Sequence, residues 1–353
     1  MSSGNPFRDC LTRKPSFWVV VCLVAAAVVL AGCGSSSKSD SGKTASTSPR
    51  PATTASSAAA PPVADMPAAE RPRASEFPPA DGRTLVQVAR LVNETATLGA
   101  ANGVFTPGVQ RLAFAVLDKA QQNVYAPTAV YVASSPTSPA RGPYLAPADP
   151  MRVEPQYRSG QDPDALKAIY STNIPLPRSG IAYLLALTRA GTRLIGSTGE
   201  AAVALSTPIP AVGQRPPAVG TDTLASVHGN ITLLTTRTPP ENMHQVSFNQ
   251  VLGKRPIALL FSTPALCTSR VCGPVTDIMT QLQHQFAGRI TFIHEEVYVE
   301  NTPSKGLRPQ MRAFHLETEP WLFTVSRNGV IAARLEGAFG VGEARQALEA
   351  ALR

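Results

Sequence analysis

The sequence has few aromatic residues and no dense block of one charge. Aromatic residues make up 6% of the 353 residues, and the formal net charge of +8 is spread along the chain. A nucleic-acid-binding surface needs Lys and Arg clustered on one face with interleaved aromatic residues, and the sequence shows no such cluster. We therefore expect no nucleic-acid partner, and we interpret the positive charge as a mild attraction to anionic lipid.

Several motifs of enzyme chemistry are also missing. The sequence contains no Gly-rich phosphate loop, no Ser-His-Asp arrangement and no metalloprotease motif. We therefore expect no nucleotide-dependent chemistry, no bound cofactor and no resident metal.

Residues 1–32 predict an export signal. Basic residues precede an apolar run at residues 17–30, which has the length of a signal-peptide core. The segment Leu30-Ala31-Gly32-Cys33 that follows resembles the lipobox of bacterial lipoproteins, in which cleavage falls just before the cysteine. The resemblance implies that Cys33 becomes the lipidated (palmitate-bearing) N-terminus, anchored at the extracytoplasmic face of the cell membrane. An uncleaved membrane anchor is the alternative.

Two regions of different composition follow this signal. Residues 33–81 are rich in Ser, Ala, Thr and Pro, cannot form an apolar core, and predict a disordered tether. Residues 82–213 carry short β-prone runs with Gly, Pro and Ser between them, and a polar loop at residues 134–163. The expected strands lie at residues 112–117, 128–132, 181–187, 192–195 and 201–205. This pattern predicts an all-β, immunoglobulin-like sandwich that serves as an interaction or spacing module.

The hydrophobic period changes in residues 214–353. Apolar runs at residues 256–262 and 289–298 predict strands, and a stripe of apolar residues from Val275 to Phe286 predicts a helix between them. Pro309 suits the first turn of a second helix. Two further strands flank Asn328-Gly329, a strong hairpin signal, and an amphipathic helix ends the chain. The predicted order is β-α-β-α-β-β-α, and we expect these residues to fold alone.

This order, with a cysteine pair between the first strand and its helix, resembles the thioredoxin fold. The segment Thr318-Glu319-Pro320-Trp321 stands where that family carries a cis-proline, and the lead-in to residue 256 is similar to extracytoplasmic redoxins of the TlpA and peroxiredoxin type. The whole arrangement also resembles actinobacterial lipoproteins. The resemblance implies that Pro320 belongs to the active site and that Glu319 contacts substrate. Trp321 is either a platform for an extended substrate peptide or the start of a core strand.

The mature chain is left with one thiol pair. Cleavage removes Cys10 and Cys22, lipid occupies Cys33, and Cys267 and Cys272 remain. In an oxidising compartment this pair is expected to be a disulfide at rest. Four residues separate the two cysteines, whereas thioredoxins have two and copper-handling SCO proteins have three.

The chemistry of the pair leaves alternatives open. A thiol at a helix N-terminus is stabilised as thiolate by unpaired backbone N–H groups, which favours Cys272 as the attacking cysteine, with Arg270 lowering its pKa further. Cys267 is then the resolving partner, although the reverse assignment is possible. A structural disulfide that closes a short loop is the other interpretation, and a metal site is the third.

His294 lies beside Glu295 and Glu296 in the strand expected at residues 289–298. These side chains offer a proton shuttle or a copper ligand for the cysteines. We favour a strand end that reaches solvent, because no Cys/His spacing matches a metal template.

The sequence therefore predicts a membrane-anchored extracytoplasmic protein that exchanges thiols and disulfides with exported proteins or small thiols through Cys267 and Cys272. The alternative is a non-enzymatic binding protein, either an SCO-like copper carrier or an interaction module with a structural disulfide.

Replacing Cys33 tests the predicted processing. The variant Cys33→Ala is expected to incorporate no lipid label and to accumulate as uncleaved precursor or as released protein. Radiolabelled palmitate followed by membrane fractionation measures this, and normal labelling of the variant would disprove the assignment.

Overall fold

The structure, a computed structural model, describes residues 64–160 and 166–353. The predicted export signal, the lipid site at Cys33 and most of the predicted tether lie outside these residues. None of the helices in the described ranges is both long enough and apolar enough to cross a membrane.

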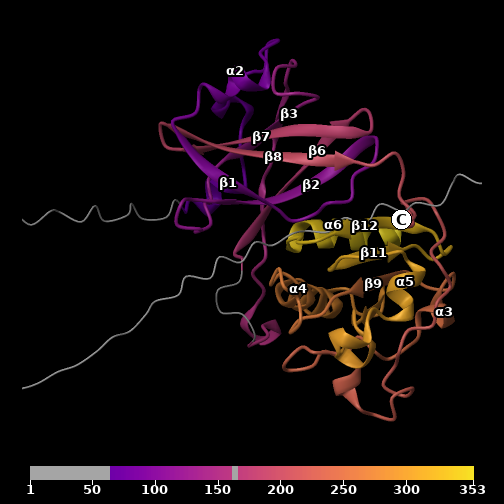
Figure 1. The fold of residues 1–353 in the computed structure, drawn as a ribbon. Helices are drawn as coiled ribbons and strands as arrows, with labels where there is room; N and C mark the ends of the chain where they lie inside the picture. The colour runs from indigo at the N-terminus through magenta and orange to yellow at the C-terminus, as the bar shows by residue number, and fades with distance from the viewer. Residues whose placement is uncertain (1–63, 161–165) are drawn as a thin grey trace, which may run out of the picture. The chain divides into compact units, whose positions relative to one another are not determined.

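An eight-stranded sheet occupies the first half of the described chain (Figure 1). Its strands are β1 (Glu94–Ala100), β2 (Gly108–Leu117), β3 (Thr128–Ala133), β4 (Arg141–Leu145), β5 (Ala148–Pro150), β6 (Ala168–Leu176), β7 (Gly180–Ala190) and β8 (Arg193–Val203). The strand order is β4-β3-β7-β8-β1-β2-β6-β5. All neighbours are antiparallel except β1 and β8, which are parallel.

This sheet curls around its own apolar core. Phe114 on β2 and Leu184 on β7 belong to one buried cluster, although their strands lie in opposite halves of the strand order. Tyr170 on β6 stacks on Phe114, and its hydroxyl hydrogen-bonds to the backbone of Ala126, just before β3. Strands dominate the domain, which also contains the short helix α2 (Leu85–Ala89), so the all-β prediction is supported in part. The immunoglobulin-like sandwich is wrong, because the described strands pair into one continuous sheet instead of two.

The ordered part of this domain begins earlier than the sequence predicts. Residues 64–81, which we assigned to the tether, include α1 (Met66–Ala69) and a short 3₁₀ helix (Ala74–Glu76). Ala69 and Phe77 are buried in the cores of the β-domain. Their apolar side chains are isolated within a polar sequence, so composition alone does not reveal this docking.

The predicted strands are matched in part. The runs at residues 112–117, 128–132 and 181–187 lie in β2, β3 and β7, but those at residues 192–195 and 201–205 belong to the single strand β8. The predicted polar loop contains β4 and β5. Strands β1 and β4 escaped prediction because their residues are mostly half-buried or exposed and carry no strong apolar run.

The second half of the chain forms a mixed α/β domain. Its elements are α3 (Phe248–Val251), β9 (Ile257–Phe261), α4 (Cys272–Gln285), β10 (Thr291–Glu295), α5 (Pro309–Ala313), β11 (Trp321–Val325), β12 (Ile331–Glu336) and α6 (Val341–Leu352). The sheet order is β10-β9-β11-β12, with β9 and β10 parallel and the other pairs antiparallel. From β9 onward the order is the predicted β-α-β-α-β-β-α. The Glu319–Pro320 bond is cis, also as predicted.

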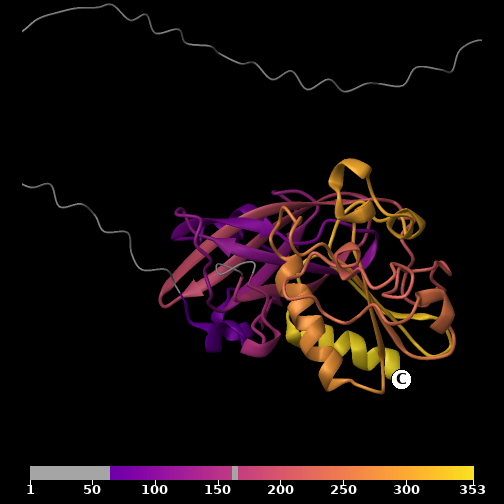
Figure 2. The same cartoon turned by 90° about the horizontal axis from the view of Figure 1, so that it is seen from below.

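Helices cover both faces of this sheet, so its central strand is apolar on both sides. Ala258 and Leu260 of β9 pack beneath α4 and α6, which lie side by side (Figure 2). Leu259 and Phe261 face the opposite cluster, which includes Phe314 beside α5. The continuous run IALLF is therefore buried along its whole length. This three-layer arrangement agrees with the predicted thioredoxin-like domain.

The two sheets share a hydrophobic core. Met151 and Ile169 of the β-domain belong to the same cluster as Val275 and Ile278 of α4. At its edge, Arg111 of β2 forms an ion pair of 2.7 Å with Glu343 of α6 and donates to the carbonyl oxygens of Glu336 and Ala338. Residues 214–353 on their own would expose the apolar surface of α4 that this core covers, and their folding alone stays a prediction.

The Arg111–Glu343 pair predicts a measurable coupling. Arg111→Ala is expected to lower the free energy of unfolding by about 3 kcal/mol, because it leaves Glu343 and two carbonyl groups without a partner in a largely buried place. The matched control is Arg193→Ala, whose pair with Glu94 is exposed and is expected to cost less than about 1 kcal/mol. Urea unfolding compares the two, and equal losses would contradict the coupling.

Candidate functional site

A ten-residue loop, residues 262–271, carries the chain from the end of β9 to the start of α4. Cys272 is the first residue of α4 and is 0% exposed, while Cys267 lies in the loop and is half-buried. Both are free thiols. Their sulfur atoms and a carboxylate oxygen of Glu319 all lie within 4.8 Å of one another. The structure thus brings together three of the residues singled out from the sequence.

Cys267 has the lower pKa of the two thiols. A hydrogen bond from the Cys272 thiol and another from Ser269, whose Oγ is 3.2 Å from the Cys267 sulfur, lower the pKa of Cys267 to about 6, against the opposing effect of partial burial. Backbone N–H groups at the start of α4 contribute in the same direction. Cys267 is therefore largely thiolate at neutral pH.

Cys272 has the opposite character. Burial raises the pKa of its thiol well above the usual value, and the hydrogen bond and negative charge shared with Cys267 raise it further. The sequence-based preference for Cys272 as attacking thiolate is therefore corrected. Position at the helix N-terminus does favour a thiolate, but at Cys272 full burial outweighs it.

Arg270 is exposed and has a left-handed backbone, with φ of 58°. Its backbone N–H donates to the carbonyl oxygen of Cys267 at 3.2 Å, which helps to fold the loop between the cysteines. Hydrogen bonds from Cys272, Ser269 and the backbone dominate the pKa of Cys267. A role of the Arg270 guanidinium in tuning that pKa stays a prediction. The contribution of Ser269 was missed because its effect depends on how the loop folds.

Glu319 and Trp321, both considered as substrate contacts, lie in different environments. Glu319 is half-buried beside the thiols, where burial and then the charge of Cys267 raise the pKa of its carboxyl group. Trp321 is only 1% exposed, packs in the core beside Phe323 and donates from Nε1 to Thr318. Of the two interpretations of Trp321, the start of a core strand agrees with this burial, since the ring offers no accessible face. Pro320 lies between the two and is buried.

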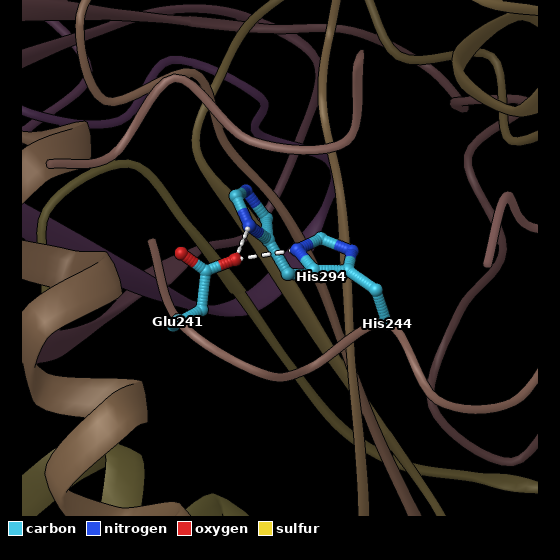
Figure 3. Close-up of side chains that lie close together, drawn as sticks. All are labelled: Glu241, His244 and His294. Carbon is cyan, nitrogen blue, oxygen red and sulfur yellow. Dashed lines mark hydrogen bonds and ion pairs between the residues drawn. The ribbon is translucent and has the colours of Figure 1, made fainter. Parts of the chain in front are cut away.

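A second polar cluster lies buried inside the same domain. Glu241 and His244 come from the segment before α3, which runs beside β10 because the backbone N–H of His294 donates to the carbonyl oxygen of Met243. Both rings turn toward one carboxylate oxygen (Figure 3). The Oε1 atom of Glu241 is 2.6 Å from His244 Nε2 and 2.7 Å from His294 Nδ1.

The charges of this cluster are mutually stabilised. Burial alone would raise the pKa of Glu241, but the charge of His294 and hydrogen bonds from both histidines lower it well below its usual value. Burial alone would lower the pKa of His294, but the charge of Glu241 and its hydrogen bond raise it. Burial lowers the pKa of His244. Both ring nitrogens of His294 face acceptors, since Nδ1 meets the Glu241 carboxylate and Nε2 lies 3.1 Å from the carbonyl oxygen of Ser262.

The interpretation of His294 as part of a strand end that reaches solvent is wrong. His294, Glu295 and Glu296 are all at most 2% exposed. The segment before α3 and the Arg308 side chain cover them, contacts that no local sequence pattern predicts. Glu241 and His244 were missed for the same reason.

The described residues contain two groups of side chains that come near enough to hold a metal ion, the Glu241 cluster and the pair of thiols with Glu319. Ligand atoms around tetrahedral zinc lie about 3.3 Å apart. The separations of 2.6 and 2.7 Å in the Glu241 cluster are those of hydrogen bonds instead. We therefore describe this cluster as a proton-bearing network.

No protein-family model matches the chain, and no curated protein matches it. Among solved structures, a protein described as the thiol:disulfide interchange protein DsbE from Chlorobium tepidum is similar over 41% of this chain and 99% of its own, with 15% identity and a TM-score of 0.30. DsbF of MTB, in mixed oxidised and reduced forms, is similar over 38% of this chain and 98% of its own, with 17% identity and a TM-score of 0.28. These scores are too low to carry an inference, so the thioredoxin-like class rests on the sheet order and the helices described above.

The hydrogen bond between the thiols predicts a pH profile. Alkylation of the reduced protein at Cys267 is expected to have a midpoint at about pH 6, because only the thiolate reacts. Cys272→Ala removes the main donor and should move the midpoint upward, whereas Cys272→Ser keeps a hydroxyl donor and should move it less. Mass spectrometry of iodoacetamide-treated protein measures both. An unchanged midpoint in Cys272→Ala would contradict the assignment.

Proposed function

We propose that the protein is a membrane-anchored, extracytoplasmic thiol–disulfide oxidoreductase that acts through Cys267 and Cys272. The observation that carries the proposal is the asymmetry of the pair: Cys267 is accessible and has a pKa lowered to about 6, while Cys272 is buried with a raised pKa. The Cys267 sulfur is thus a thiolate that can attack, while Cys272 stays a protonated thiol until the mixed disulfide is resolved. A structural disulfide needs no such difference.

In the reducing direction the first step is an attack by the Cys267 thiolate on a substrate disulfide. A bond forms between the Cys267 sulfur and one substrate sulfur, the substrate disulfide breaks, and the other substrate sulfur leaves as thiolate. Cys272 then loses its proton and attacks the Cys267 sulfur. The Cys267–Cys272 disulfide forms, the second substrate thiolate leaves, and two electrons have passed from the protein to the substrate.

Glu319 is the group that accepts the proton of Cys272 in this scheme. Its carboxylate lies within 4.8 Å of both sulfurs, and its pKa is raised by burial and by the charge of Cys267. A raised pKa makes it a stronger base than an exposed carboxylate. When Cys267 enters the mixed disulfide its negative charge disappears, which removes two of the effects that raise the pKa of Cys272, while burial still raises that of Glu319. The proton then moves to Glu319 as Cys272 becomes the nucleophile.

The anchoring and the partners follow from the N-terminal signals. A lipid on Cys33 and a tether before residue 64 would place the dithiol near the outer surface of the membrane, where exported proteins and small thiols are its substrates. Gly273, in the first turn of α4, is buried, and Ser159 of the β-domain lies near it. The β-domain therefore contacts the helix turn that begins with Cys272.

A copper carrier is the second candidate. Two thiolates and a carboxylate within 4.8 Å of one another form a donor set in which the soft sulfur atoms favour Cu(I). In this case the reduced protein should bind one Cu(I) through Cys267 and Cys272 and show no exchange. A simple structural disulfide should resist mild reductant and do neither.

Trapping separates these functions and assigns the roles. Cys272→Ser is expected to accumulate mixed disulfides through Cys267 with exported proteins, because attack still occurs but resolution does not. Cys267→Ser is the matched control and should trap at least about tenfold less, because the remaining thiol is buried and protonated. Acid-quenched, non-reducing gels measure the complexes.

The opposite pattern, with trapping through Cys267→Ser alone, would reverse the roles of the cysteines. If neither variant traps a partner and the native disulfide survives mild reductant, the oxidoreductase function is disproved.

A further inference from the structure

One peptide unit connects the buried His294 cluster with the dithiol. The carbonyl oxygen of Ser262 lies 3.1 Å from His294 Nε2, on the side of the Glu241 cluster. The N–H of the next residue, Thr263, belongs to the same peptide group and faces Cys272, where it acts to lower the pKa of the thiol against the larger effect of burial. The peptide between Ser262 and Thr263 therefore has the imidazole at one end and the buried sulfur at the other.

A chain of hydroxyl groups makes a second connection. Ser262 Oγ lies 2.8 Å from His294 Nε2 and 2.8 Å from Thr276 Oγ1. The Thr276 hydroxyl donates to the carbonyl oxygen of Cys272 at 2.8 Å. Both connections start at His294 and end on the residue that resolves the mixed disulfide. Ser262 and Thr276 are fully buried, so water does not compete for these bonds.

We propose that Glu241 and His294 are positioning residues of the dithiol site, which prepare Cys272 for attack through the Ser262–Thr263 peptide and through the Ser262 and Thr276 hydroxyls. The inference rests on the proposed exchange function, since it concerns the second step of that reaction. Neither residue touches the sulfur atoms, so neither is a catalytic residue.

From His294 to Cys272, each group in this network donates a hydrogen bond to the next group. Glu241 Oε1 accepts from Nδ1–H of His294, and the carbonyl oxygen of Ser262 beside Nε2 can only accept, so Nε2 carries the second proton of the imidazolium and donates toward Ser262. The Ser262 hydroxyl is then free to donate to Thr276, and Thr276 donates to Cys272. A neutral His294 would instead take the Ser262 proton at Nε2 and break this order. Glu241 fixes the direction because its carboxylate keeps the imidazolium protonated.

Polarisation explains how the pair acts on a sulfur that it does not touch. A charged donor on a carbonyl oxygen draws electron density through the peptide and makes its N–H a stronger donor at the other end. The Thr263 N–H therefore stabilises a thiolate on Cys272 better than an ordinary amide does. That thiolate exists only during resolution, after Cys267 has entered the mixed disulfide.

Other charged groups lie near this network. Glu296 faces both histidines and accepts hydrogen bonds from Thr236. Glu319 and Tyr298 lie beside the sulfurs, and Asp277 of α4 pairs with Arg237 of the segment before α3. These groups are common to all the variants compared below, so differences between matched variants report on the Glu241–His294 pair alone.

Glu241→Gln tests the inference in the full chain. The amide keeps the shape of the side chain but no longer stabilises the imidazolium, so Cys272 should lose part of its thiolate stabilisation. In a Cys267→Ser background the titration midpoint of Cys272 should rise by about half a unit to one unit, measured by thiolate absorbance. In the wild-type background, resolution of a preformed mixed disulfide should slow about three- to tenfold.

The matched control is Glu295→Gln. Glu295 is a buried carboxyl group on the same strand, and burial raises its pKa to about 8, so the amide resembles its protonated form. It forms an ion pair with Arg308, and His294 acts on it only through charge, without a hydrogen bond. The control should leave the Cys272 midpoint and the resolution rate unchanged.

A second variant with its own control tests the same inference if Glu241→Gln does not fold. Thr276→Val removes the hydroxyl that reaches Cys272, whereas Thr280→Val removes the same type of hydroxyl one turn later, where it donates to the carbonyl oxygen of Thr276. Only Thr276→Val should slow resolution about three- to tenfold.

The outcomes separate the two proposals. If Glu241→Gln folds and shows the same Cys272 midpoint and resolution rate as Glu295→Gln, the positioning role is overturned while the exchange function stands. If Glu241→Gln does not fold, equal resolution rates in Thr276→Val and Thr280→Val lead to the same conclusion. If the wild-type protein itself performs no exchange, the proposed function fails first.

Discussion

The hydrogen bond that the Cys272 thiol donates to the Cys267 sulfur is the interaction on which the site depends. It is the largest of the effects that lower the pKa of Cys267, and it requires that Cys272 stay protonated. Burial provides that condition by raising the pKa of Cys272. The four-residue separation between the cysteines therefore does not uncouple them, since the loop folds back and brings both sulfurs to Glu319.

The fold places each part of this arrangement. Strand β9 ends at Phe261, beneath helices on both faces, and the loop leaves it beside the first turn of α4. At the start of the loop, the carbonyl oxygen of Ser262 bonds to His294 on β10. The N–H of Thr263, at the opposite end of the same peptide group, faces Cys272. The β-domain packs on α4 through the shared core, so the helix that carries Cys272 is fixed by both halves of the chain.

The elements that could be predicted from the sequence are those with strong local signals. The continuous apolar run of β9, the helical stripe of α4, Pro309 and the Asn328-Gly329 hairpin gave the element order of the C-terminal domain correctly. In the β-domain, strands such as β1 are only half-buried, and the curl of the sheet depends on contacts between strands far apart in sequence. Hydrophobic periodicity does not encode those contacts.

In the candidate site, too, only the features with a local sequence signal could be predicted. The cysteine pair and Glu319 were found from spacing and resemblance, but the roles of the two thiols depend on burial, which reversed our preference. Trp321 was left with two interpretations because an aromatic residue beside a proline fits a binding surface and a core strand equally well, and burial favours the core. Glu241 and His244 carry no local motif. They form a cluster only because the folded chain brings them next to His294.

The reduction potential of the Cys267–Cys272 couple in the intact protein tests the central claim most directly. An exchange protein with one stabilised thiolate should show a reversible two-electron couple between about −270 and −120 mV, the range of thiol–disulfide oxidoreductases. Equilibration with glutathione or dithiothreitol buffers, followed by thiol labelling, gives this value. A potential below about −300 mV, typical of structural disulfides, would contradict the account.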